Sequence, residues 1–261
     1  KPKKSLGQNF LIDNNIINKI IQLSDINNNH IVEIGPGTGS LTKAILNKNP
    51  KSLFLIEKDQ KLANHLKKEF IDIKKLKIFN EDILKFNLEE KIKKKTIIIG
   101  NLPYNISSQI LAKLIKFKVW PPNYSKLILM FQKEVAEKIS AQNKSAKFGR
   151  LTVLVNSRLK VTESMSISEN SFRPIPKVKS TILVFEPIKN QDFKVKNIFN
   201  LEIITHAFFS KKRKMINKVF KKLFNNPKLI AEKIKINLNL RPNKVSDKQY
   251  YKITEYFEKE N

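Results

Sequence analysis

The residues best suited to chemistry are Asn101, Leu102, Pro103 and Tyr104, which follow the apolar run 96–100. Four β-branched residues ending in Gly-Asn are typical of a buried parallel strand that stops abruptly. Pro103 lacks a backbone donor and fixes its own φ, so the loop is stiff and not all nearby carbonyls are paired internally. An amide oxygen, main-chain carbonyls and a flat ring together suit a planar amino group, such as the exocyclic nitrogen of adenine. The same residues are also common in ordinary strand-to-helix turns.

A glycine loop indicates a nucleotide-type site. The strand pattern at 30–34 runs into Gly35-Pro36-Gly37-Thr38-Gly39, and a helix pattern follows. Glycines let a ligand approach the backbone, and the start of a helix supplies unpaired N–H groups. The spacing differs from the G-x-G-x-x-G dinucleotide fingerprint, and the loop lacks the G-K-[ST] ending of a P-loop. Close backbone packing is the alternative explanation for such a loop.

Acidic residues follow the next two predicted strands. Glu57 ends the strand at 52–56 and lies 22 positions after Gly35, the distance at which an acidic residue binds ribose hydroxyls in nucleotide-binding βαβ units. Asp82 and Ile83 follow the strand at 76–80, where a carboxylate and a backbone N–H suit an adenine edge. The alternatives are a solvated carboxylate at Glu57 and turn chemistry at Asp82.

The elements that would position these residues alternate along the chain. Strand patterns at 30–34, 52–56, 76–80, 96–100 and 127–131 are separated by helix patterns, which predicts an α/β fold with a parallel sheet. The last two strands, 160–167 and 179–186, are expected to form an antiparallel edge. We expect Asp13 and Ser107 to cap helices.

After Pro187 the chain changes character. The patterns near 199–209, 215–224, 228–236 and 246–257 are all helical, and Ser246 with Gln249 fits a capping box. We therefore predict two domains, a sheet domain over 1–187 and a small helical domain over 188–261. Residues 151–155 have strand propensity, with a helix as the alternative.

The net charge of +28 indicates a polyanionic partner, and nucleic acid is the first candidate. A compositional bias towards Lys, Ile and Asn would raise the charge without any role in binding. The basic tetrad of Lys211, Lys212, Arg213 and Lys214 stands beside Phe208 and Phe209. It is a candidate for RNA-phosphate contact, and a solvated helix face is the alternative.

Several classes of protein are disfavoured. The chain has no cysteine and 3 widely spaced histidines, so we expect no disulfide and no metal site. No apolar run approaches the roughly 20 residues of a membrane span, and no signal peptide is evident. We therefore expect no membrane association and a cytoplasmic location.

Taken in order, these motifs resemble the small-subunit ribosomal RNA adenine-N6 dimethyltransferases of the KsgA type, over nearly the whole chain. Each motif alone is weak, but the ordered set is specific. The resemblance implies a class I methyltransferase (Rossmann-like) domain with a seven-stranded sheet that binds S-adenosylmethionine (SAM), followed by an all-α C-terminal domain. The motifs that carry it lie at residues 7–11, 33–39, 56–57, 82–83, 101–106, 132–135, 149–151, 172–178 and 213–214.

By motif position, the resemblance implies that Asn9 and Leu11 contact the cofactor. Gly35, in one loop with Gly37, would lie under its methionine part, and Glu57 would hold the ribose. Asp82 and Ile83 would bind the adenine of the cofactor, and Asn101 would lie between cofactor and target. Arg150 joins the tetrad as an expected RNA contact, and the family pattern makes 149–157 a helix, which we adopt. The chain departs from the family in the number of lysines at 211–214 and in lacking a glycine near Leu223.

The expected reaction is methyl transfer to adenine N6 without a metal. Asn101 Oδ1 and the main-chain carbonyl of Leu102 or Pro103 would accept the N6 hydrogens and aim the lone pair at the methyl group. Tyr104 and Phe172 would stack on the extruded base. The resemblance implies dimethylation of two adjacent adenosines near the 3′ end of 16S RNA, in the immature small subunit, by a monomer.

Three other functions stay open. A large-subunit RNA methyltransferase of the antibiotic-resistance type shares the Asn-x-Pro-aromatic loop, although its glycine loop usually reads differently. A non-catalytic RNA- or DNA-binding assembly or transcription factor could use the same scaffold. A nucleotide-dependent oxidoreductase is disfavoured by the spacing of the glycines.

Overall fold

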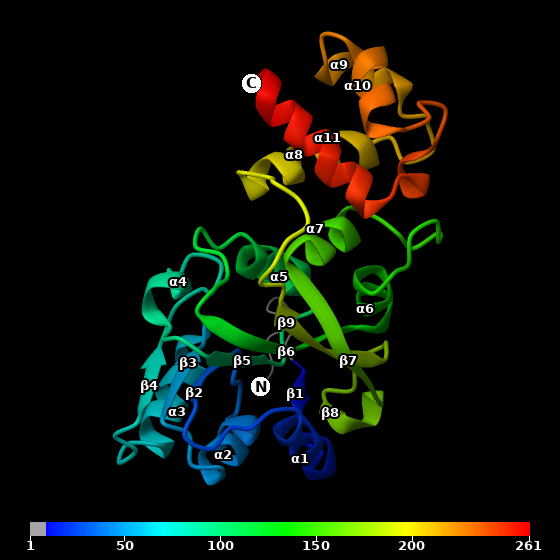
Figure 1. Cartoon of the computed structure of the whole chain (residues 1–261). Helices are drawn as coiled ribbons and strands as arrows, with labels where there is room; N and C mark the ends of the chain where they lie inside the picture. The colour runs from blue at the N-terminus through cyan, green and yellow to red at the C-terminus, as the bar shows by residue number, and fades with distance from the viewer. Residues whose placement is uncertain (1–8) are drawn as a thin grey trace. The chain divides into compact units, whose positions relative to one another are not determined.

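A computed structural model describes residues 9–261, so Gly7 and Gln8 of the first motif lie outside the described residues. The chain divides into two compact units (Figure 1). The first runs to residue 136 and resumes over 161–187, and the second comprises 137–160 and 188–261. Each unit is described by itself. Within the described residues, no helix is both long and apolar enough to cross a membrane.

The first unit is built on a 7-stranded sheet with the order β4-β3-β2-β5-β6-β9-β7. The five strands from β4 to β6 are mutually parallel, and β9 runs antiparallel to β6. The predicted α/β fold with an antiparallel strand near one edge is therefore confirmed. The strands are β2 (His30–Ile34), β3 (Ser52–Ile56), β4 (Leu76–Phe79), β5 (Thr96–Gly100), β6 (Tyr124–Gln132), β7 (Leu159–Ile167) and β9 (Ser180–Pro187).

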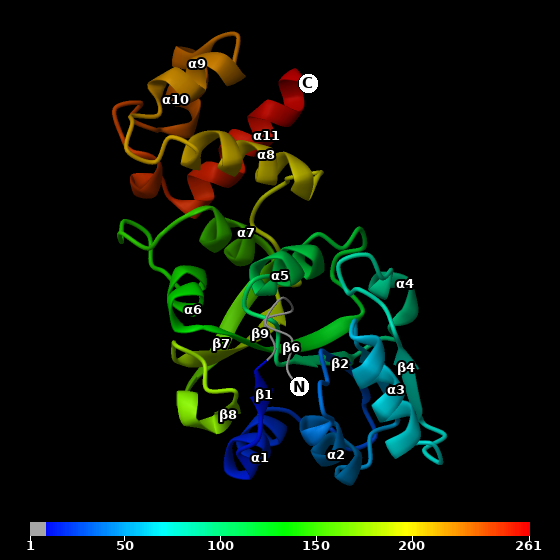
Figure 2. The ribbon, with the colours of Figure 1, turned by 180° about the vertical axis from the view of Figure 1, so that it is seen from behind.

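Helices cover both faces of this sheet, with α1 and α2 on one face and α5 on the other (Figures 1 and 2). Alternate strand residues such as Leu53, Leu55 and Ile97 share one core with α1, α2 and α3. That alternation follows from the two-residue period of a strand. The helices are α1 (Asn14–Gln22), α2 (Ser40–Asn47), α3 (Gln60–Glu69), α4 (Leu88–Lys91), α5 (Ser107–Ile115) and α6 (Lys133–Ile139).

The two predicted helix caps have different outcomes. Asp13 accepts hydrogen bonds from the backbone N–H groups of Asn15 and Ile16, so the cap on α1 is confirmed. The cap predicted at Ser107 is wrong, because Ile106 occupies the N-cap position of α5. Ser107 Oγ instead donates to the Tyr104 carbonyl at 3.1 Å, which ties the start of α5 to the preceding loop.

Two short strands form a separate ladder that the sequence did not predict. β1 (Phe10–Leu11) pairs antiparallel with β8 (Phe172–Arg173), placing Phe10 opposite Arg173 and Leu11 opposite Phe172. The backbone N–H of Ile12 continues this pairing by donating to the Ser171 carbonyl at 2.9 Å. Residues 10–12 are therefore paired with a part of the chain far away in sequence.

The second unit is helical. Its core contains Phe208, Phe220 and Tyr250, whose rings meet edge to face. The helix that the family pattern placed over 149–157 is confirmed, and the strand favoured by propensity is wrong. Ser246 and Gln249 form the predicted capping box. The helices are α7 (Arg150–Arg158), α8 (Ile198–Phe209), α9 (Asn217–Leu223), α10 (Pro227–Ile234) and α11 (Asp247–Glu260).

The compact units and the predicted domains differ over one stretch. Residues 137–160 pack with the helical unit, whereas the boundary drawn at 187 assigned them to the sheet domain. Helix α7 explains the difference, because the Val153 carbonyl accepts a hydrogen bond from the hydroxyl of Tyr251 in α11. The division into a catalytic and an RNA-contacting domain stays a prediction.

Candidate active site

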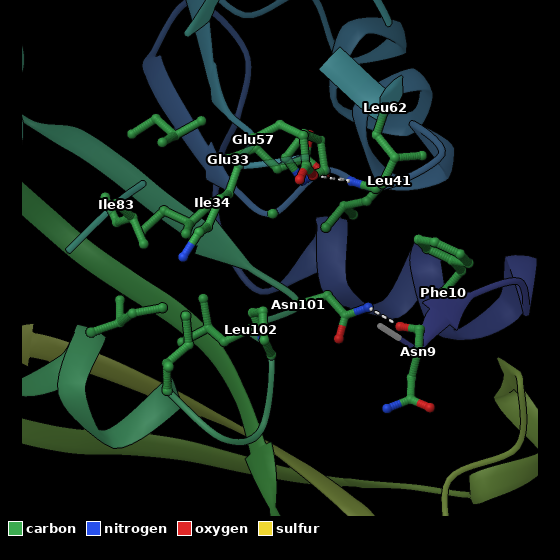
Figure 3. Close-up of a pocket in the computed structure, with 18 of the residues that line it drawn as sticks. Asn9, Phe10, Glu33, Ile34, Leu41, Glu57, Leu62, Ile83, Asn101 and Leu102 are labelled. Carbon is green, nitrogen blue, oxygen red and sulfur yellow. Dashed lines mark hydrogen bonds between the residues drawn. The ribbon is translucent and has the colours of Figure 1, made fainter. Parts of the chain in front are cut away.

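A pocket lies at the carboxyl ends of the parallel strands (Figure 3). Parallel strands deliver the loops that follow them to one edge of the sheet, where ligands of open α/β folds bind. The loops after β2, β3, β4 and β5 all contribute, together with the segment around β1. The residues predicted from sequence that line it are Asn9, Leu11, Gly35, Gly37, Glu57, Asp82, Ile83, Asn101, Leu102, Pro103 and Tyr104.

The glycine loop after β2 forms the floor of the pocket. Gly35 and Gly37 have φ values of +69° and +59°, a region that side chains disfavour. A Cβ on Gly37 would also lie 2.9 Å from the ring of Phe10, which covers the loop. The loop therefore needs glycine for its backbone conformation and for the close approach of the N-terminal segment.

Glu57 is bound to this loop by its side chain. Its Oε2 accepts from the Gly37 N–H at 3.2 Å (Figure 3), and its Oε1 accepts from the Asp59 N–H at 2.8 Å. Glu57 is 7% exposed, and burial raises the pKa of its carboxyl. Each carboxylate oxygen keeps acceptor capacity beyond one bond, so Glu57 can still accept from ligand hydroxyls.

The loop after β4 supplies a carboxylate and a backbone donor. Asp82 Oδ2 accepts from Lys58 Nζ at 2.8 Å, and Oδ1 accepts from the Leu84 N–H at 2.9 Å. The hydrogen bond from Lys58 lowers the pKa of Asp82, so this carboxyl is ionised at neutral pH. Within the described residues, the backbone N–H of Ile83 donates to no protein acceptor, and it lies in the pocket wall.

The direction in which the Asn101 side chain points is fixed by one hydrogen bond. Its Nδ2 donates to the main-chain carbonyl of Asn9 at 3.0 Å, and the amide oxygen points away from that contact (Figure 3). A carbonyl can only accept, so the NH₂ group must face Asn9 and Oδ1 must face the other way. Asn9 directly precedes β1, which pairs with β8. The orientation of the Asn101 amide therefore depends on a pairing between segments that are far apart in sequence.

The two main-chain carbonyls proposed as acceptors are not equivalent. The Pro103 carbonyl accepts from the Ile106 N–H at 3.1 Å. The Leu102 carbonyl accepts from no donor among the residues that the structure describes. Leu102 is therefore the better second acceptor beside Asn101.

The two aromatic residues expected to stack on a base differ in position. Tyr104 lines the pocket, and its hydroxyl is hydrogen-bonded to Ser180 Oγ. Burial raises the pKa of Tyr104, so the ring stays neutral. Phe172 is 0% exposed, packs in the core below β8 and does not line the pocket. The structure therefore does not place Phe172 in the wall of the pocket, and its stacking on a base stays a prediction.

The expected RNA contacts lie in the helical unit. Lys211, Lys212, Arg213 and Lys214 are all exposed and occupy the turn after α8, so they do not form a helix face. Arg150 at the start of α7 forms an ion pair with Glu202. Their contact with RNA stays a prediction.

The pocket residues that were not predicted as site residues include Glu33, Lys58 and Phe10. Glu33 in β2 is 1% exposed, accepts from Thr42 Oγ1 at 2.6 Å, and has its pKa raised to about 8 by burial. Its signal was a lone carboxylate in an apolar strand just before the glycine loop. Lys58 and Phe10 gave no comparable signal, since their roles arise from contacts with Asp82 and Gly37. Among the described residues, no group of three or more His, Asp and Glu is arranged to hold a metal.

The sequence profile of the family described as ribosomal RNA adenine dimethylase matches residues 1–259. The chain belongs to the ribosomal RNA adenine dimethylase family. A family relative from Pelagibacter ubique strain HTCC1062, named ribosomal RNA small subunit methyltransferase A, is 45% identical and covers 99% of this chain and 97% of its own.

Solved structures agree with this assignment. The crystal structure of a dimethyladenosine transferase from Plasmodium falciparum has a TM-score of 0.80 and 27% identity, over 96% of this chain and 98% of that one. The 23S rRNA methyltransferase ErmE has a TM-score of 0.68 at 20% identity, over 96% of this chain and 100% of that one. The second likeness shows the fold alone, which is that of class I methyltransferases.

Proposed function

We propose that this chain transfers methyl groups from SAM to N6 of two adjacent adenosines near the 3′ end of small-subunit (16S) ribosomal RNA. Each round converts SAM to S-adenosylhomocysteine and releases one N6 proton, and two rounds on each base give N6,N6-dimethyladenosine. Membership of the ribosomal RNA adenine dimethylase family supports the reaction, and the relative named small subunit methyltransferase A supports the subunit. We further propose that the chain acts as a monomer on the immature small subunit in the cytoplasm.

The main structural support is the orientation of the Asn101 amide, whose oxygen is turned away from Asn9. An amide so anchored accepts hydrogen bonds from a planar amino group at a fixed angle. The Leu102 carbonyl is a second acceptor in the same stiff loop. Two acceptors suit the two hydrogens on N6 of adenine.

The residues of the pocket fit SAM. Glu57 can accept from ribose hydroxyls while it holds the glycine loop, and Ile83 N–H with Asp82 suits an adenine edge. Gly35 and Gly37, both at positive φ, line the pocket where the amino-acid part would lie, and Asn9 and Leu11 line the same pocket. When bound, SAM supplies a methyl group on a positively charged sulfur, which is already activated for transfer.

The protein's part in the reaction is to orient adenine N6. Its lone pair is delocalised into the ring, so N6 is a poor nucleophile. Hydrogen bonds from N6 to Asn101 Oδ1 and the Leu102 carbonyl favour a tetrahedral nitrogen and fix the direction of its lone pair. Positioning and electrostatic stabilisation then account for the acceleration. The ring of Tyr104, steadied by Ser180, provides a face for the extruded base.

The helical unit would contribute to RNA binding. We propose that Lys211, Lys212, Arg213 and Lys214 contact RNA phosphates, with Arg150 contributing less because Glu202 already pairs with it.

The function is tested with labelled SAM, given separately to naked small-subunit RNA, immature small subunits and large-subunit RNA, followed by mapping of modified bases. We expect label in N6,N6-dimethyladenosine at two adjacent positions of small-subunit RNA. Label in large-subunit RNA would support the antibiotic-resistance type. SAM binding without transfer to any RNA would support a non-catalytic role.

A further inference from the structure

We propose that residues 173–179, here called the proline loop, bind the RNA strand beside the extruded adenosine. In this proposal Ile175 fills the space that the base leaves in its stack, and Arg173, Lys177 and Lys179 contact flanking phosphates. The inference rests on the proposed function, because it concerns the RNA bound at the same site. It adds a second contact surface next to the pocket, separate from the basic tetrad.

The proline loop borders the pocket at both of its ends. At one end, Arg173 pairs with Phe10, which lines the pocket. At the other, Ser180 Oγ is hydrogen-bonded to the hydroxyl of Tyr104, another lining residue. The Lys179 carbonyl also accepts from the Lys133 N–H at 2.9 Å. The loop therefore runs along the rim from the N-terminal segment to the aromatic ring of the catalytic loop.

The loop is stiff between these anchors. Pro174 and Pro176 each fix their own φ, and Pro176 is buried while its neighbours on both sides are exposed. A pre-organised loop of this kind loses little conformational entropy when it binds a strand. Its exposed side chains are thus presented in a defined arrangement.

The side chains presented by the loop have the chemistry of a nucleic-acid contact. Ile175 and Val178 are 52% and 43% exposed. Arg173, Lys177 and Lys179 are exposed around them, and no acidic residue occurs between Glu169 and Glu186. No carboxylate of the described residues forms an ion pair with these three cations. Apolar wedges flanked by cations are how proteins unstack bases while holding the backbone.

The position suits extrusion of the target. A base that enters the pocket leaves a gap in its own strand, and unstacking it costs a few kcal/mol. An apolar side chain at the rim reduces that cost by occupying the gap. Ile175 is the more exposed of the two apolar residues in the loop and is flanked by the two prolines.

The wedge is tested by steady-state methylation of immature small subunits with Ile175→Ser. We expect kcat to fall about tenfold while KM for the subunits changes less than about twofold, because the wedge acts after binding. Ile175→Leu keeps a large apolar side chain and should therefore keep the wild-type kcat. Ile71→Ser, at another exposed isoleucine of the same unit, is the matched control and should behave as wild type. An unchanged kcat for Ile175→Ser would overturn the wedge.

The cationic contacts are tested by binding alone, without turnover. The Kd for naked small-subunit RNA is measured between 50 and 200 mM salt for Lys177→Gln/Lys179→Gln and for the exposed control pair Lys67→Gln/Lys68→Gln. Loss of two phosphate contacts should reduce the slope of log Kd against log salt by about 1.4. The control should keep the wild-type slope, and equal slopes for both variants would overturn the strand contact. A wild-type chain that binds RNA without methylating it would refute the proposed function and leave this test valid.

Discussion

The catalytic loop at 101–104 and the basic tetrad at 211–214 contrast in how the fold holds them. Asn101 is anchored to Asn9, and the end of its loop is tied to α5 through Ser107. The tetrad occupies an exposed turn, where Lys212 Nζ donates to the Ala146 carbonyl but all four side chains face solvent. A site that depends on the direction of two acceptors should fail abruptly when altered. A site that depends on summed charge should weaken gradually.

The largest expected effect is at Asn101. Asn101→Ala should lower methyl transfer by about 10²–10³, since it removes an acceptor aimed at the reacting nitrogen. The Kd for SAM, measured by calorimetry, should change less than about threefold. Asn64→Ala, on the exposed face of α3, is the matched control. Near wild-type turnover by Asn101→Ala would mean that the catalytic loop does not depend on the direction of this acceptor.

Asn101→Asp separates the two functions of the amide. It keeps an acceptor oxygen but loses the donor to the Asn9 carbonyl, and it places a negative charge next to that carbonyl. We expect it to be nearly as inactive as Asn101→Ala if orientation matters. Substantial activity in this variant would show that the anchor to Asn9 is dispensable.

The next effect in size is at Glu57. Glu57→Gln keeps the shape of the side chain but loses its charge, and hydrogen bonds to a charged group are worth about 1.5–3 kcal/mol. The Kd for SAM should rise about 10- to 100-fold, with kcat at saturating SAM almost unchanged. Glu90→Gln, exposed in α4, is the control. A fall in kcat with unaltered SAM affinity would contradict the ribose role.

The free energy of unfolding is expected to depend on pH through the buried carboxyl of Glu33. Its pKa is raised from 4.5 to about 8 by burial, so the folded state binds a proton that the unfolded state releases in this window. Stability should therefore fall as pH rises from about 4.5 to 8, by at most about 1.4 kcal/mol per pH unit. Glu33→Gln should lack this component. Urea unfolding at pH 5 and pH 9 measures it, and Glu90→Gln should keep the wild-type dependence. Parallel pH curves for wild type and Glu33→Gln would contradict the account.

The smallest effect is expected at the tetrad. Lys211→Gln/Lys214→Gln should raise the KM for immature subunits a few-fold at about 0.1 M salt and leave kcat unchanged, because exposed charges add to binding without direction. The fold-increase in KM should shrink as salt increases, because the variant has fewer phosphate contacts that depend on salt. Lys221→Gln/Lys222→Gln removes the same charge from α9 and serves as the comparison. Equal KM values for the two pairs would mean that the tetrad has no special role.

Much of the fold followed from local patterns. Apolar strands that end in glycine or an acidic residue placed Gly35, Glu57, Asp82 and Asn101 at one sheet edge, and the structure brings them into one pocket. Parallel strands guarantee that meeting, whatever the intervening helices contain. The family pattern corrected the local propensity at 151–155, where packing within the helical unit decides the outcome.

What the sequence could not predict depends on distant pairing. No local signal joins Phe10 to Arg173, yet that ladder pairs Leu11 with Phe172 and lies next to Asn9, which accepts a hydrogen bond from Asn101. No local signal joins Arg150 to Glu202 either, and this ion pair reduces the contribution expected of Arg150 to RNA binding. Ser107 failed as a cap because the preceding loop uses its hydroxyl.

The most informative measurement is a crystal structure of the chain with SAM bound. We predict that the sulfur-borne methyl carbon faces the space in front of Asn101 Oδ1 and the Leu102 carbonyl, with Glu57 on the ribose hydroxyls. A methyl carbon that points away from residues 101–104, or an Asn101 amide turned from Asn9 when SAM is bound, would contradict it.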